Sequence, residues 1–271
     1  MISRFLKTIW LVPVMALVVA GCGLLHKRDV DALASGPGVE TLAIKADYAS
    51  AAIEVTGGLQ CWAKTRKLDF DCVVTVYRPD DSFYLTEHHV NVYPWSNSIR
   101  ISAQEPLSKF VWQLSNGRFS VSEGNERADV SPMRGLYRDY AEAILNVTTA
   151  PVRFLDDSAG FIKAPEPVKM EGLWYYPIEQ TQHIAPAASA ARGRKHIAPH
   201  WSKVIFYQNR DSLLVDMLWF ADVGKERFLA VRGYNYKEVE KDGVSAPTQI
   251  EIFITDAHSV FKKRIAKIDV K

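Results

Sequence analysis

The chain has 271 residues, of which 48% are hydrophobic and 24% charged; this is a globular composition and excludes a fibre or wholesale disorder. Its 33 basic and 31 acidic residues give a net charge of +2, well below the excess of a polyanion-binding protein, so we expect no nucleic-acid partner. Three cysteines are too few for a scaffold built from disulfides.

The first 21 residues have the layout of a secretory leader. A short cationic segment with Arg4 and Lys7 precedes an apolar run from Ile9 to Ala20, which is short for a membrane span. The run ends in Val19-Ala20-Gly21-Cys22, which resembles the bacterial lipobox. The resemblance implies cleavage before Cys22, a diacylglycerol on its thiol and acylation of its new amine. Two or three acyl chains hold a protein on a membrane, which thus becomes a partner.

Two other interpretations of the leader stay open: a plain signal peptide, and an uncleaved anchor with a chance cysteine. In enterobacterial sorting, an aspartate directly after the lipidated cysteine favours the inner membrane. Gly23 stands there in this chain and therefore favours the outer membrane. We expect a lipid-anchored protein of the bacterial cell envelope that faces the periplasm.

Residues 22–40 are mixed in character and contain Gly36-Pro37-Gly38, which is typical of a tether. Residues 41–271 then form the globular domain. Its first expected element is a helix over residues 41–55, because apolar residues recur there at helical spacing, and Gly57-Gly58 is a stop signal.

A period of two follows the helix and predicts strands. The expected strands of the first half are residues 68–76, 83–93, 98–103, 109–114 and 118–122. Asn116-Gly117 between the last two is a strong hairpin signal.

The middle of the chain returns to a helical period over residues 131–147, where Ser131-Pro132 supplies an N-cap and a first-turn proline. The expected strands after it are residues 173–178, 203–207, 212–220, 227–234, 249–255 and 262–270. This order predicts an α+β fold with one long, curved antiparallel sheet, an incomplete barrel whose concave apolar face is covered by helices.

Residues 183–200 stand apart, because they are rich in alanine and basic residues and are bordered by His183, His196 and His200. We interpret the segment as a mobile surface loop. A metal site is the weaker alternative, since the histidines lack both the carboxylate or cysteine neighbours and the tight helical spacing that zinc sites usually show. Contact of the basic cluster with lipid headgroups or an acidic partner is another.

Motifs of covalent chemistry are missing from the sequence: there is no G-x-S-x-G, H-E-x-x-H, Walker A, G-x-G-x-x-G or C-x-x-C. His88 and His89 are neighbours in an expected strand and point to opposite faces, so they do not easily share a metal. We therefore expect no catalytic residue, no metal and no cofactor, and a protein that is not an enzyme. An enzyme with scattered catalytic residues stays an alternative.

Cys61 and Cys72 remain once Cys22 is lipidated. An exported protein lies in an oxidising compartment, so a disulfide between these two is expected, and it would stabilise the fold by roughly 2–3 kcal/mol. Two buried thiols are the alternative.

Aromatic residues concentrate on the expected strands. Six of them are candidates for lining an apolar groove that accepts an acyl chain or similar ligand: Phe110, Trp112, Trp174, Tyr176, Phe206 and Trp219. Ordinary core packing is the alternative, because a groove and a core have the same period.

Two stretches resemble the LolA/LolB-like superfamily of lipoprotein-carrier folds. One runs from Ala51 through Gly57-Gly58 to Trp62, a helix followed by two glycines and a tryptophan. The other runs from Tyr234 to Thr255 and contains Ala246-Pro247-Thr248 at the opening of a late strand. The resemblance implies a half-barrel over about residues 41–270, closed by helices, that binds an acyl chain or a lipoprotein and performs no covalent chemistry.

The sequence thus predicts a membrane-anchored lipoprotein whose half-barrel binds an apolar ligand, in lipid or lipoprotein transport. A non-catalytic envelope scaffold or sensor that binds a protein partner is the alternative of a different class.

Overall fold

The computed structural model describes residues 46–104, 110–115, 117–123, 126–127, 134–156, 159–182, 200–239 and 243–271. The leader, the tether and residues 183–199 lie outside this part of the chain. Among the described residues, no helix is both long and apolar enough to cross a bilayer.

Two short helices open the described part, where the sequence predicts a single one. Helix α2 spans Asp47–Glu54 and α3 spans Gly58–Lys64. Gly57, with a φ of +114°, is the N-cap of α3 and lies three residues after the end of α2, so the glycine pair forms the corner between two helices and does not stop the helical segment. Trp62 anchors the corner: its buried indole nitrogen donates to the Thr56 hydroxyl over 2.9 Å.

Fourteen strands form one antiparallel sheet. In chain order they are β1 Leu68–Tyr77, β2 Phe83–Tyr93, β3 Ser98–Gln104, β4 Phe110–Ser115, β5 Arg118–Glu123, β6 Glu126–Arg127, β7 Ala159–Lys163, β8 Val168–Met170, β9 Leu173–Gln182, β10 Lys203–Asn209, β11 Val215–Asp222, β12 Arg227–Glu238, β13 Ser245–Thr255 and β14 Phe261–Val270. The spatial order is β6-β5-β4-β3-β2-β1-β14-β13-β12-β11-β10-β9-β7, and β8 also pairs with β9. Because β6 and β7, the ends of this order, do not pair with each other in the described part of the chain, the sheet is an open, incomplete barrel. The α+β fold expected from the sequence is confirmed.

The first and the last strand in the sequence are paired with each other in the middle of the sheet. β14 pairs with β1 in a register that places Val270 opposite Cys72. Side chains alternate along β1, so that Leu68, Phe70, Cys72 and Val74 are buried while Asp69 and Asp71 are exposed. This alternation gives the sheet one continuous apolar face.

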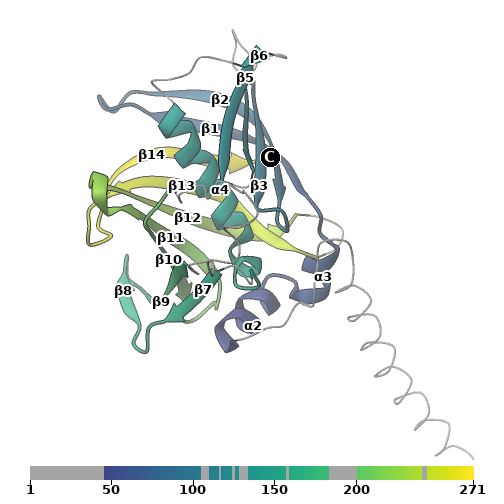
Figure 1. Cartoon of the computed structure of the whole chain (residues 1–271), viewed down its shortest axis with the longest axis vertical. Helices are drawn as coiled ribbons and strands as arrows, with labels where there is room; N and C mark the ends of the chain where they lie inside the picture. The colour runs from purple at the N-terminus through teal and green to yellow at the C-terminus, as the bar shows by residue number, and fades with distance from the viewer. Residues whose placement is uncertain are drawn as a thin grey trace, which may run out of the picture. The chain divides into compact units, whose positions relative to one another are not determined.

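Helix α4, Arg134–Arg153, covers this concave face. Figure 1 shows it crossing between the β1–β5 side of the sheet and the β10–β12 side. It continues beyond residue 147, where the expected helix ends, and includes Pro151 in its last turn. The buried hydroxyls of Thr148 and Thr149 donate to the carbonyls of Ile144 and Leu145, so this turn is satisfied internally and can be buried.

Candidate functional site

The interior between α4 and the sheet is the candidate site, because small-molecule sites are concave and lined mainly by apolar side chains, as this face of the sheet is. The helix contributes small and aliphatic side chains to this interior, and they are buried: Ala141, Ala143, Ile144, Leu145, Val147 and Ala150. The concave faces of β1–β4 and β10–β13 supply the other wall of the same core.

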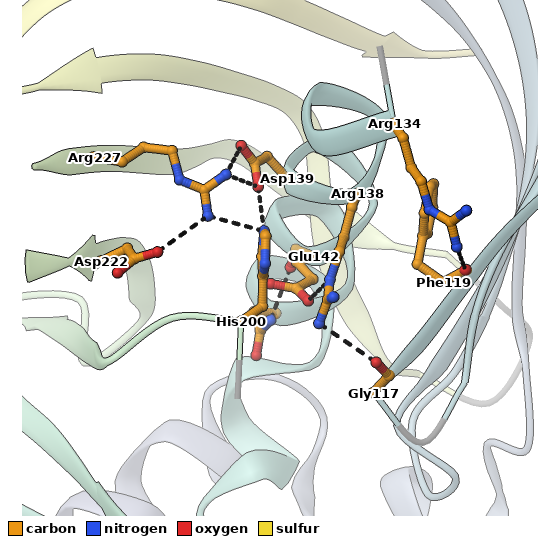
Figure 2. Close-up of polar contacts among 10 residues, drawn as sticks. Gly117, Phe119, Arg134, Arg138, Asp139, Glu142, His200, Asp222 and Arg227 are labelled. Carbon is orange, nitrogen blue, oxygen red and sulfur yellow. Dashed lines mark hydrogen bonds and ion pairs between the residues drawn. The ribbon is translucent and has the colours of Figure 1, made fainter. Parts of the chain in front are cut away.

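A polar network ties the first half of α4 to the β11–β12 side of the sheet (Figure 2). The Asp139 carboxylate is 7% exposed and accepts hydrogen bonds from Arg227 Nη1 at 3.1 and 3.0 Å. His200 Nε2 lies 2.5 Å from Asp139 Oδ1, and Asp222 lies 3.9 Å from the Arg227 guanidinium. The guanidinium also stacks over the Trp201 ring, 4.3 Å from its centroid. A buried carboxylate is thus matched by one cation and a histidine.

The other side of α4 is tied to the β4–β5 hairpin. Arg134 Nη2 donates to the Phe119 carbonyl over 2.7 Å, and Arg138 Nη2 lies 3.4 Å from the Gly117 carbonyl (Figure 2). Arg138 also pairs with Glu142 over 3.0 Å. Burial raises the pKa of Glu142, opposed by His200 and Arg138. We call these contacts, from Arg134 to Glu142 and on to Arg227, the latch, because they fix the helix to both arms of the sheet.

The interior has two unlike ends. Near the C-terminal end of α4 it is filled by aromatic rings: Phe154 lies edge-on to Tyr48 and Phe161, and 5.4 Å from Phe206. Such edge-to-face packing is favourable in a dry core.

Near the N-terminal end of α4 the aromatic rings carry polar atoms. Tyr137 stacks on Trp112 with 4.5 Å between the ring centroids, and Tyr140 stands edge-on to Trp112. The Tyr140 hydroxyl lies 3.4 Å from Nδ1 of His88, which is 3% exposed. Burial lowers the pKa of His88 to about 4, so this imidazole is neutral at neutral pH.

Three of the six predicted groove residues, Phe110, Trp112 and Phe206, belong to the concave core that α4 covers. Trp219 does not: it lies in a second cluster with Tyr175 and Tyr207 on the opposite face of the sheet, and donates to Thr255. Its neighbours in sequence face the concave core, and side chains alternate along a strand.

The other two groove candidates lie on β9. Trp174 is 41% exposed and stands beside the Lys169 ammonium, while Lys163 lies 4.1 Å over the Tyr176 ring. The strand period therefore places aromatic residues on the sheet without telling which of them face α4.

The expected Cys61–Cys72 disulfide is not formed; both are free thiols. Cys72 lies on β1 between His88 and Val270, four residues and hence about 13 Å along an extended strand from its start. Cys61 lies in α3, which ends at Lys64, before β1 begins at Leu68. A disulfide needs Cα atoms within about 7 Å, and the extended strand from Leu68 to Cys72 leads away from its own beginning by more than that. Burial raises the pKa of Cys72 to about 12, so its thiol is unreactive.

His88 and His89 point to opposite faces, as expected, because His88 is buried while His89 contacts Asp69 and Asp71 outside. Sequence reasoning missed the latch. Asp139 and Arg227 are 88 residues apart, and nothing in the sequence pairs them. The one available signal was a carboxylate within the apolar stripe of a helix.

Acid is expected to destabilise the fold through His88. Its folded pKa, about 4, lies below the unfolded value of 6.5, so between these values the unfolded chain binds a proton that the folded chain does not. Stability is fully present above pH 6.5 and falls by about 1.4 kcal/mol per pH unit as pH falls toward 4. Urea unfolding of the wild type and of His88→Gln between pH 7 and 5 should show the steeper decline in the wild type.

His89→Gln is the matched control, since it removes the neighbouring histidine on the exposed face. The groups nearest His88, Tyr140 and Cys72, are uncharged throughout this range. Equal pH slopes for the wild type and His88→Gln would contradict the prediction.

The fold and its interior define a class of protein, an open antiparallel half-barrel that encloses a long helix, and this is the architecture that the LolA/LolB resemblance implies. No family model matches the chain, and no curated protein matches it. Solved structures do resemble it.

A LolA superfamily protein from Nitrosomonas europaea is 13% identical at a TM-score of 0.49, with 83% of this chain and 90% of that chain covered. A DUF1329 family protein from Desulfovibrio piger is 13% identical at a TM-score of 0.42, covering 85% and 92%. A structure described as an outer membrane lipoprotein-sorting protein domain, from Vibrio parahaemolyticus, is 9% identical at a TM-score of 0.41, covering 82% and 91%. At these identities the similarity concerns the fold alone.

Proposed function

We propose that this protein is a bacterial envelope lipoprotein whose half-barrel binds an acyl chain, or a similar apolar ligand, between α4 and the sheet. Lipid carried on Cys22 would tether it to a membrane, with Gly23 favouring the outer membrane and the domain facing the periplasm. The ligand would be a lipid or the acyl chains of a lipoprotein in transport through the envelope.

The observation that carries the proposal is the seating of α4. A helix of 20 residues lies in the concavity of an open sheet, with an apolar side toward the sheet and polar contacts from its first half to both arms. An acyl chain that slides between helix and sheet exchanges water for apolar surface, at about 0.8 kcal/mol for each buried methylene. The buried second half of the helix anchors it in the core, whereas the first half is tied to the sheet by a few polar side chains, so that half can act as a lid.

A specific observation favours a second candidate, an envelope scaffold or sensor that binds a protein partner. The aromatic packing of Tyr48, Phe154, Phe161 and Phe206 fills one end of the interior without a ligand. A core that is solid along its whole length would leave only the outer surface for binding.

Native mass spectrometry tests the proposal in two arms. The soluble form, residues 23–271 purified from bacterial cells, is expected to carry an added mass of phospholipid or fatty-acid size. After delipidation it should bind a fluorescent acyl probe in the micromolar range. The full chain purified from membranes should show diacylglyceryl and acyl increments on the peptide that begins at Cys22.

Each arm can fail by itself. A bare polypeptide mass that persists after incubation with lipid vesicles, together with no probe binding, would overturn ligand binding and favour the scaffold or sensor. An unmodified Cys22 in the membrane-derived protein would overturn the anchor and leave ligand binding standing.

A further inference from the structure

Three buried polar atoms on the concave face have no hydrogen-bond partner among the described residues: Thr86 Oγ1, His88 Nε2 and Trp112 Nε1. Each of these residues is less than one-tenth exposed. An unpaired buried polar group costs about 1–3 kcal/mol, so three on one surface are a substantial penalty for the empty protein.

The strand register places these residues in a row on the concave face, with His88 between Thr86 and Trp112. Thr86 and His88 are two apart on β2 and so share a face. Ala103 on β3 lies opposite His88, and its small side chain leaves room for the Trp112 ring of β4. The His88 and Trp112 ring centroids are 5.1 Å apart. Tyr137 and Tyr140 of α4 stand over the pair, so the lid covers this spot.

All three groups are uncharged and can donate a hydrogen bond. The Trp112 indole nitrogen can only donate, and the Thr86 hydroxyl can donate. The neutral His88 ring carries one proton; when the Tyr140 hydroxyl donates to Nδ1, that proton is on Nε2, which is then a donor as well. The groups that press on His88 from β1 and α4, Cys72 and Tyr140, are uncharged too.

We propose that Thr86, His88 and Trp112 form a carbonyl-binding subsite, which holds the ester or amide carbonyl oxygen of an acyl-linked ligand under α4. A neutral carbonyl oxygen offers these donors two lone pairs, whereas an ionised carboxylate would be buried without a cation paired to any of the three groups in the described part of the chain, and would pay a larger desolvation cost. The aromatic rings of Tyr137, Tyr140 and Trp112 form its apolar surround. The inference rests on the proposed function and deepens it by naming the linkage recognised.

Four fluorescence titrations of the soluble form at pH 8 test the subsite. The probes are an anthroyloxy-stearate methyl ester, the corresponding N-methylamide, the free acid, and diphenylhexatriene, which has no carbonyl. We expect the ester or the amide to bind at least tenfold more tightly than the ionised acid, and the preferred one of the two identifies the linkage.

Thr86→Val and Trp112→Phe each remove one donor while keeping most of the shape. Each should weaken ester or amide binding about fivefold to tenfold and leave diphenylhexatriene binding within twofold. Thr86→Val should also raise the melting temperature of the empty protein, because it deletes a buried hydroxyl without a partner. Trp174→Phe, an exposed tryptophan on β9, is the matched control and should change no titration.

The outcomes distinguish failure of the carbonyl subsite from failure of the proposed function. If diphenylhexatriene binds but the two variants leave ester and amide affinities unchanged, the donors serve a bound water, and the subsite is overturned while the proposed function stands. If the wild type binds none of the four probes, both fall. If Trp112→Phe fails to fold, the probe affinities and the melting temperature of Thr86→Val decide whether the subsite exists.

Discussion

Gly57→Ala is expected to lower the free energy of unfolding by about 4 kcal/mol or more. A β-carbon on Gly57 would stand 2.1 Å from the Gly243 carbonyl oxygen, and this contact is with backbone. A φ of +114° adds strain for any residue with a β-carbon. Both effects act at the corner between α2 and α3, where Ser245 N–H also donates to the Thr56 carbonyl, so neither segment can move aside cheaply.

Substitutions at two other glycines distinguish the steric clash from the strain of a positive φ. Gly172→Ala has an unfavourable φ of +83° but no atom within 4 Å of the new β-carbon, so it should cost only about 1 kcal/mol. Gly135→Ala lies in the first turn of α4 with open space around it and should be neutral or stabilise by up to about 1 kcal/mol. Urea unfolding of the three variants measures the order, and a Gly57→Ala protein as stable as Gly172→Ala would contradict the steric argument.

Arg227→Met is expected to cost about 3 kcal/mol and to loosen the latch. The methionine keeps apolar contact with Trp201 but leaves the buried Asp139 carboxylate without its cation. Removing one partner of a buried ion pair is more costly than replacing both by apolar residues. The double variant Asp139→Leu/Arg227→Met should therefore recover to within about 1 kcal/mol of the wild type, measured by denaturant unfolding.

If α4 is a lid, the same change should speed ligand entry. Weakening the closed state by 1.4 kcal/mol raises the open population tenfold, so the association rate of the acyl probe in stopped flow should rise at least tenfold in Arg227→Met. Lys262→Met is the control, because its pair with Asp256 is solvent-accessible and joins residues at the β13–β14 turn, not residues of α4. A stability loss without faster uptake would mean that the network holds the fold together but does not gate the interior.

The latch and the carbonyl subsite lie on the same half of α4. Asp139 faces the β11–β12 arm while the neighbouring Tyr140 faces His88, so one turn of helix carries a closing contact and covers the polar spot. Opening this turn would uncover His88 and Trp112, which Tyr140 and Tyr137 contact. In the proposed function, release of the lid would thus also give the polar part of a ligand access to this spot.

Much of the fold was predictable from local pattern. The period of two along residues 68–76 and 83–93 placed β1 and β2 nearly to the residue, because each strand has one buried and one exposed face. The Asn116-Gly117 signal placed the β4–β5 hairpin. Helix α3 and the short strands β6, β7 and β8 were missed, since brief segments without caps or long alternation carry little periodic signal.

The candidate site was less predictable, because its parts meet only through the register of distant strands and one helix. Sequence alone determined that an apolar sheet face exists, that Trp112 and Phe206 lie on strands, and that a helix follows the first five strands. Only the tertiary structure decided that Trp219 faces away from α4, that Cys61 and Cys72 stay apart, and that Asp139 meets Arg227. Periodicity fixes which side of an element is apolar, whereas the choice of partners across 88 residues depends on how the sheet curves around α4.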